Sequence, residues 1–163
     1  MILTGTAGEK YPKFRDYLYY RFPKVIQSSK IVEAMLSHGS IYEDEFRTVL
    51  HPGSHPAIDV EEAAAEPGTY YSCELGVIKG EKISLYTPLV APFNDGPWYK
   101  ENFFKNAKGQ DVPIIGAVLL HFLCHWGLRD SALFYSSDGD PGYKFEKEVY
   151  GRRARLQLIT AVS

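Results

Sequence analysis

Four of the five histidines form two pairs, and the members of each pair are four residues apart. His121 and His125 lie in the apolar run LLHFLCHW, whereas His51 and His55 lie in the segment HPGSHP. Residues four apart share one face of a helix, and imidazole is the side chain that most often binds metals in proteins. The spacing therefore points first to metal-dependent chemistry.

His121 and His125 fall within a predicted helix, Val112–Trp126, which would place them one turn apart on one face. Cys124 adds a sulfur beside them, and zinc is the cofactor that accepts nitrogen and sulfur ligands together. A peptidase helix of the H-E-x-x-H type carries a general-base glutamate directly after its first histidine. Phe122 stands there instead, which argues against a metallopeptidase. Two core or boundary histidines, hydrogen-bonded to backbone or to a carboxylate, are the simpler explanation of the pattern.

His51 and His55 have no helix to align them, because Pro52 and Gly53 interrupt the segment between them. Both histidines are still candidate metal ligands on a loop, and Asp59 is a candidate third ligand. A surface turn rich in histidine and proline is the simpler alternative. If the two pairs met in space they would form a site with four histidines, but the sequence does not show whether they meet.

A cysteine nucleophile is the second chemical candidate. Such a thiol needs a base within hydrogen-bond reach, and Cys124 is poorly placed for this because neighbouring helical residues diverge by about 100°. Cys73, on a predicted strand, is the better candidate, with His121 or His125 of the packed helix as its base. No helix is predicted to follow Cys73, so the usual means of lowering a thiol pKa is missing.

An acidic turn follows the histidine helix. The segment Asp138–Gly142 contributes two carboxylates, and Glu146 and Glu148 come soon after it. Hard cations prefer such groups of oxygen ligands. Aspartate, glycine and proline are also the residues that a tight turn requires, and a plain turn is the simpler interpretation.

Composition excludes several classes of protein. The 163 residues carry a net charge of −2 and are 45% hydrophobic, which is typical of one globular domain spanning 1–163. The weak charge makes nucleic acid an improbable partner. Two cysteines are too few for a disulfide framework, and no apolar run is long enough to span a membrane. Without a visible signal peptide, we expect a cytoplasmic protein.

The elements that would position these residues are predicted in chain order. Helical spacing and capping residues favour four helices before a change of character near residue 67, a candidate sub-boundary. A hairpin, a short helix, the histidine helix and a three-stranded meander follow. In order, the predicted ranges are 12–22, 29–38, 40–51, a short helix capped by Asp59, the strands 69–78 and 82–90, the helices 97–106 and 112–126, and the strands 131–137, 143–149 and 154–158.

The order of elements predicts an α+β fold. An N-terminal helical layer would pack on an antiparallel sheet, built from the hairpin and the C-terminal meander, with one central buried helix. Two functions remain. The first is a hydrolase- or transferase-type enzyme that uses histidine with a metal or a thiol on a small-molecule or protein substrate. The second is a non-catalytic binding, inhibitor or immunity-type module that presents exposed aromatic residues such as Trp98 and Tyr99 to a protein partner.

Overall fold

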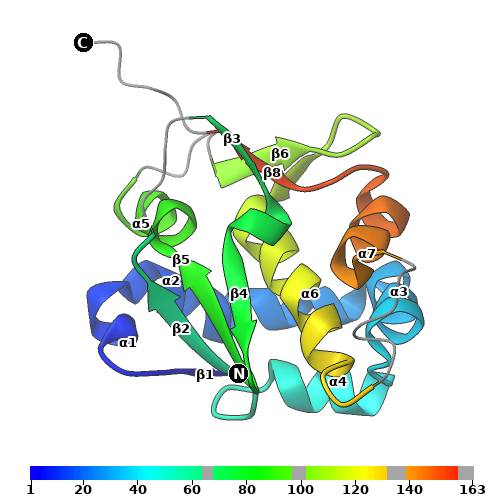
Figure 1. The fold of residues 1–163 in the computed structure, drawn as a ribbon, viewed down its shortest axis with the longest axis horizontal. Coiled ribbons are helices and arrows are strands. Elements are labelled where there is room, and N and C mark those ends of the chain that lie inside the picture. Colours follow the sequence, from blue (N-terminus) through cyan, green and yellow to red (C-terminus); the bar gives the residue numbers. More distant parts are fainter. Residues whose placement is uncertain (64–67, 97–101, 132–138, 158–163) are drawn as a thin grey trace.

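The computed structural model describes residues 1–63, 68–96, 102–131 and 139–157. Its main sheet has the strand order β1-β2-β5-β4, with bounds Ile2–Leu3, Ala57–Glu61, Lys82–Tyr86 and Gly76–Lys79. The first three strands run parallel, and β4 pairs antiparallel with β5. β4 therefore lies at an edge of the sheet (Figure 1).

Helices cover the sheet and extend beyond it. Between the helices of the first 16 residues and the helix that begins at Ser29, the chain forms a π-helical turn, 17–21, and a 3-10 helix, 22–27. The α-helices are α1 (Ala7–Lys10), α2 (Pro12–Asp16), α3 (Ser29–Gly39), α4 (Glu43–Leu50), α5 (Thr87–Asp95), α6 (Ile114–Gly127) and α7 (Pro141–Tyr150). None of the helices in the described ranges is both long enough and apolar enough to cross a membrane.

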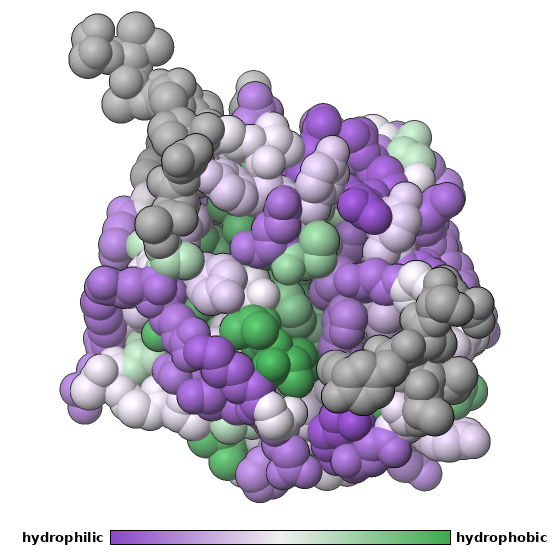
Figure 2. Space-filling view, viewed as in Figure 1, coloured by the Kyte–Doolittle hydropathy of each residue, from purple (hydrophilic) through white to green (hydrophobic). Residues whose placement is uncertain are grey.

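Helix α6 is the centre of the core. It runs between β4 on one side and α3 and α7 on the other (Figure 1). Twelve of its side chains are buried, as expected for a helix that is apolar nearly all round. The prediction of one central buried helix is confirmed. On the face shown in Figure 2, apolar residues gather near the place where Figure 1 shows β4 and α6.

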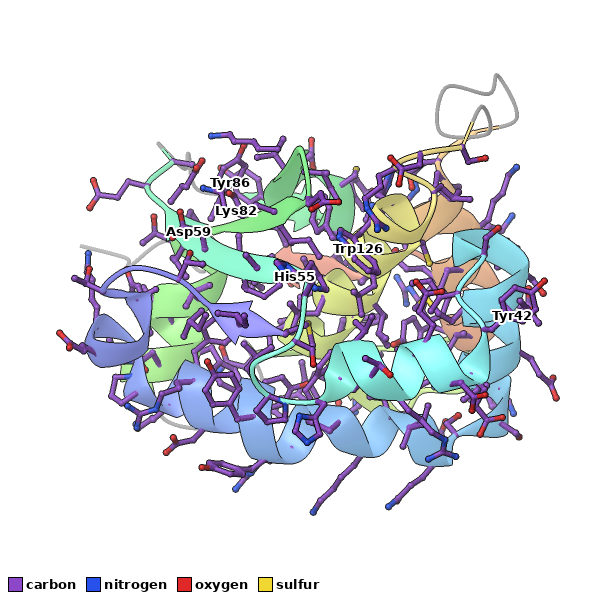
Figure 3. All side chains as sticks on the ribbon, turned by 90° about the horizontal axis from the view of Figure 1, so that it is seen from below. Tyr42, His55, Asp59, Lys82, Tyr86 and Trp126 are labelled. Carbon is purple, nitrogen blue, oxygen red and sulfur yellow. The ribbon has the colours of Figure 1, made fainter. Side chains whose placement is uncertain are left out.

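The α+β class is confirmed, but the sheet is mixed rather than antiparallel. The predicted helix capped by Asp59 is wrong, because this residue lies within strand β2. Ile58 is fully buried and pairs with Ile83 of β5. The Asp59 carboxylate contacts Lys82 Nζ at 3.2 Å across the two strands (Figure 3). A local capping pattern was thus overridden by pairing between strands distant in sequence.

The C-terminal meander is also wrong, because residues 143–149 belong to α7. The side chain of Asp140 accepts a hydrogen bond from the backbone N–H of Tyr143, Pro141 occupies the first turn, and Gly151 ends the helix with a φ of 74°. These are the usual signals of a helix start and end. The predicted strand 131–137 falls almost wholly outside the described residues.

Strands β3 (Thr69–Tyr71) and β8 (Arg155–Gln157) pair antiparallel. The predicted strand 154–158 is therefore confirmed in part. Its partner, β3, is the beginning of the segment 69–78, which was predicted as the first strand of the hairpin. The hairpin itself consists of β4 and β5. Its second strand ends at Tyr86, where α5 begins.

The segment before α6 also differs from its prediction. Residues 97–101 lie outside the described ranges, and Phe103–Lys105 form β6, which pairs with β7 (Asp111–Pro113). Asp111 is consequently part of a strand and does not cap α6. In the N-terminal half, Ser28 rather than Ser29 caps α3, and Tyr42 rather than Ser40 precedes α4.

Candidate metal centre

Two elements supply a compact group of metal-ligating side chains. His121 and His125 come from one face of α6, and Asp140 comes from the residue directly before α7. Oδ1 of Asp140 lies 3.1 Å from Nε2 of His125 and 3.5 Å from Nε2 of His121. The side chain of His121 is 1% exposed, whereas those of His125 and Asp140 are 20% and 32% exposed. The group therefore reaches from the core to the surface.

The two distances to Asp140 match the spacing between ligands of one zinc ion, and all three ligand atoms lie within 4.8 Å of one another. Ligands bound tetrahedrally at zinc's usual bond lengths of about 2.0–2.1 Å lie roughly 3.4 Å apart. In addition, Nε2 of His121 is buried and has no hydrogen-bond partner among the described residues. A buried polar atom without a partner is costly, and a metal ion would satisfy it. The residues present thus fit a zinc ion held by two histidines and one aspartate.

The other ring nitrogen of His121 is fixed by a buried carboxylate. Nδ1 of His121 lies 2.8 Å from Oε1 of Glu146, which is fully buried in α7. Since a carboxylate accepts, Nδ1 donates and Nε2 keeps its lone pair for a metal. A carboxylate behind a metal-binding histidine is a common arrangement in zinc sites. The second oxygen of Glu146 accepts from the backbone N–H of Ala154 at 2.7 Å.

Ser72 approaches the same nitrogen, with its Oγ 3.3 Å from Nδ1 of His121. In a serine-hydrolase triad, the serine and the acidic residue contact opposite nitrogens of the histidine. Here Ser72 and Glu146 share one nitrogen, so the three residues do not form such a triad. They hold the imidazole in place.

Close packing of α7 on α6 makes this arrangement tight. A Cβ atom added to Gly142 would come within 2.4 Å of Cγ and Nδ1 of His121. Only glycine allows α7 to approach the imidazole so closely. The start of α7 therefore places Asp140 beside both histidines and packs against the ring of His121.

Electrostatics favour a charged Asp140. Partial burial by itself would raise the pKa of this carboxyl, but the hydrogen bond with His125, the electrostatic influence of the two imidazoles and the hydrogen bond from the Tyr143 N–H outweigh it. The pKa consequently lies well below its ordinary value. The anionic form is the one that binds a cation.

The structure brings together one of the two predicted histidine pairs. His121 and His125 share a site, and the alternative prediction, histidines hydrogen-bonded to carboxylates, describes the same contacts. Asp140 was predicted as a turn residue or as one of a group of oxygen ligands, but not as a partner of the histidines. A carboxylate that follows an H-x-x-x-H segment could have indicated a third ligand. The prediction of a strand at residues 143–149 gave no reason for Asp140 to lie beside α6. Cys124 contributes nothing to the group, because its thiol is buried against the sulfur of Met35 at 3.8 Å.

His51 and His55 lie outside this group. His51 ends α4, and its Nδ1 lies 3.0 Å from the carbonyl oxygen of Pro52. His55 sits on the connection between α4 and β2 (Figure 3). The thiol of Cys73 is in a 3-10 turn, Ser72–Glu74, beside α6. Burial, followed by the charges of Asp140 and Glu74, raises the pKa of this thiol, which disfavours a reactive thiolate.

Comparison with known families bears on the same region. No curated protein and no solved structure matches this chain. A family model described as metallopeptidase toxin 3 matches residues 7–151, which include all three candidate ligands. Excluding a metallopeptidase because of Phe122 was therefore wrong at the level of the family, although the glutamate is still absent from that position. The chain belongs to the metallopeptidase toxin 3 family.

Proposed function

We propose that this domain is a metal-dependent hydrolase of the peptidase-toxin type, which acts on a protein or peptide. His121, His125 and Asp140 would hold the metal, with zinc as the first choice. The observation that carries the proposal is the buried Nε2 of His121, which has no hydrogen-bond partner in the described residues, lies 3.5 Å from Oδ1 of Asp140 and is within 4.8 Å of the ligand atom of His125. Membership of a metallopeptidase family supports the same chemistry.

Each residue has a physical task in this proposal. Glu146 fixes the tautomer and orientation of His121, and Asp140 supplies negative charge while it caps α7. A zinc ion bound here would polarise a substrate carbonyl and acidify a water molecule. Three protein ligands leave a position free for substrate or water, which is typical of catalytic rather than structural zinc sites.

The edge of the main sheet beside the site would bind a peptide substrate. β4 pairs with β5 on one side only within the described sheet, and an edge strand can bind an extended peptide through backbone hydrogen bonds. Phe122 links this strand to the histidine helix, since a Cβ atom on Gly76 of β4 would lie 2.8 Å from the Phe122 ring. The apolar surface over β4 and α6 in Figure 2 would contact substrate side chains.

The alternatives have less support. A thiol enzyme would depend on Cys73, whose pKa is raised, and it is Ser72 that contacts His121. The aromatic residues proposed for a binding module, Trp98 and Tyr99, lie outside the described residues. The metal-dependent hydrolase is the function that the geometry supports best.

Thermal unfolding of chelator-treated protein tests the metal half of this proposal. A ligand that binds only the folded state raises the melting temperature, so zinc should stabilise the wild type and have far less effect on His125→Ala. Prolonged incubation with a mixed-sequence quenched peptide library tests the hydrolytic half. Cleavage that is unaffected by chelator, or retained in His125→Ala, would contradict the proposal.

A further inference from the structure

Phe122 occupies the position next to the first histidine of the metal pair. Its ring centroid lies 5.0 Å from that of His121 and 6.0 Å from that of His125. The side chain at position 122 therefore flanks both imidazoles, and it is nearly buried, with 5% of its surface exposed. An apolar ring fills the place where a peptidase helix carries its proton-transferring carboxylate.

Glu146 and Asp140 are carboxylates that contact these histidines, and each already has another task. Both oxygens of Glu146 are engaged, one with Nδ1 of His121 and one with the N–H of Ala154. This residue also lies on the Nδ1 side of the ring, away from Nε2 and the proposed metal. Asp140 faces both Nε2 atoms as a ligand. Neither residue replaces the glutamate that is missing at position 122.

Peptide hydrolysis needs such a group because protons must move. The oxygen of water bonds to the carbonyl carbon, the bond between carbon and nitrogen breaks, and one proton of the water ends on the leaving nitrogen. A nearby carboxylate takes this proton and passes it on, which is worth about 10²–10⁴ in rate. A phenyl ring can neither accept nor donate it.

We propose that the described part of this chain has kept the metal-binding half of a peptidase site but has lost the carboxylate at position 122 that transfers protons, and that Phe122 limits the hydrolytic rate. The inference rests on the proposed function, because it requires a metal at the three ligands. It predicts a protein that binds zinc normally and hydrolyses peptides slowly. It also predicts that one substitution, Phe122→Glu, supplies the missing group.

The test compares wild type, Phe122→Glu and the matched neutral variant Phe122→Gln. Zinc affinity, measured by competitive titration, should agree within about threefold in all three proteins, because position 122 is not a ligand. Hydrolysis of the mixed-sequence quenched peptide library should rise about 100-fold or more in Phe122→Glu and stay near the wild-type rate in Phe122→Gln. A wild type as fast as Phe122→Glu would overturn the inference, as would a Phe122→Glu no faster than Phe122→Gln.

A buried glutamate can destabilise the fold. A second variant, Phe122→Ala, therefore tests the inference without placing a glutamate at this position. Phe122→Ala opens space beside the histidines for formate, a small carboxylate added in solution. Formate should accelerate hydrolysis by Phe122→Ala and leave the wild type, in which the ring fills the space, unchanged. No acceleration in a folded, zinc-binding Phe122→Ala would overturn the inference.

The zinc titration distinguishes a failure of the proposed function from a failure of the inference about Phe122. If none of these proteins binds zinc, the proposed function fails and the inference falls with it. If zinc binds but neither glutamate nor formate accelerates hydrolysis, the inference fails while the metal site stands.

Discussion

Glu146 accepts a hydrogen bond from Nδ1 of His121 at 2.8 Å, and both side chains are almost completely buried. The contact joins α7 to α6 at the point where the proposed metal would bind. It fixes which nitrogen of His121 carries hydrogen, and so which nitrogen faces Asp140.

Glu146→Gln should weaken zinc binding by about 10–100-fold, which is the usual effect of removing a carboxylate behind a metal-binding histidine. The new amide has a single acceptor oxygen, so it cannot accept hydrogen bonds from both Nδ1 of His121 and the N–H of Ala154. We therefore expect the free energy of unfolding to fall by about 1–3 kcal/mol. Competitive zinc titration and chemical denaturation measure the two effects. Glu148→Gln is the control, because Glu148 lies on the same helix but contacts His38. Equal zinc affinity in both variants would contradict the role of Glu146.

Two substitutions at Asp140 separate its role as a ligand from its role as a helix cap. Asparagine caps helices about as well as aspartate, so Asp140→Asn should keep the cap's contribution to the stability of the metal-free protein, while losing the charge that faces the two histidines and the zinc affinity. Asp140→Ala should lose both, with an additional cost of about 1 kcal/mol from the missing cap. Denaturation of the metal-free proteins and zinc titration give the comparison. Zinc affinity retained in Asp140→Asn would remove Asp140 from the ligand set.

Gly142→Ala should disturb the site through packing alone. The new methyl group would meet the imidazole of His121 at 2.4 Å, and overpacking of this kind costs about 1–3 kcal/mol. We expect lower stability together with weaker zinc binding. Gly8→Ala is a matched control, because Gly8 is also the second residue of a helix and its new methyl would make only ordinary contacts, at 3.6 Å from Leu3. Equal behaviour of the two variants would show that α7 does not constrain His121.

The thiol of Cys73 should react slowly at neutral pH. Burial and the charges of Asp140 and Glu74 raise the pKa of this thiol, so the reactive thiolate is scarce at pH 7 and increases as the pH rises toward that pKa. Alkylation by iodoacetamide should therefore accelerate by about tenfold per pH unit above pH 7. Cys73→Ser leaves only the buried Cys124 and measures the background. Rapid alkylation below pH 7 would instead favour the thiol-enzyme alternative.

The α+β class and the central apolar helix could be predicted from sequence because they depend on local pattern. Residues 114–127 are apolar on all sides, and that signal needs no distant partner. Strand β2 could not be predicted in this way, because Asp59 carries a local capping pattern and only pairing with β1 and β5 makes the segment a strand. Helix α7 was missed although Asp140, Pro141 and Gly151 mark its ends, since its polar and apolar residues also alternate.

That single error accounts for most of what was missed in the site. With residues 143–149 as a strand, nothing brings Asp140 or Glu146 to the histidines. With the same residues as a helix capped by Asp140, both carboxylates reach His121. The histidine pair could be found by its spacing, whereas its carboxylate partners depend on how two helices pack.

Zinc stoichiometry in equilibrium dialysis tests the central claim most directly. Wild type and His51→Ala should each bind a single zinc ion per chain, because His51 lies outside the metal group, while His125→Ala should lose tight binding. Undiminished zinc binding in His125→Ala, or loss of zinc in His51→Ala, would contradict a metal centre formed by His121, His125 and Asp140.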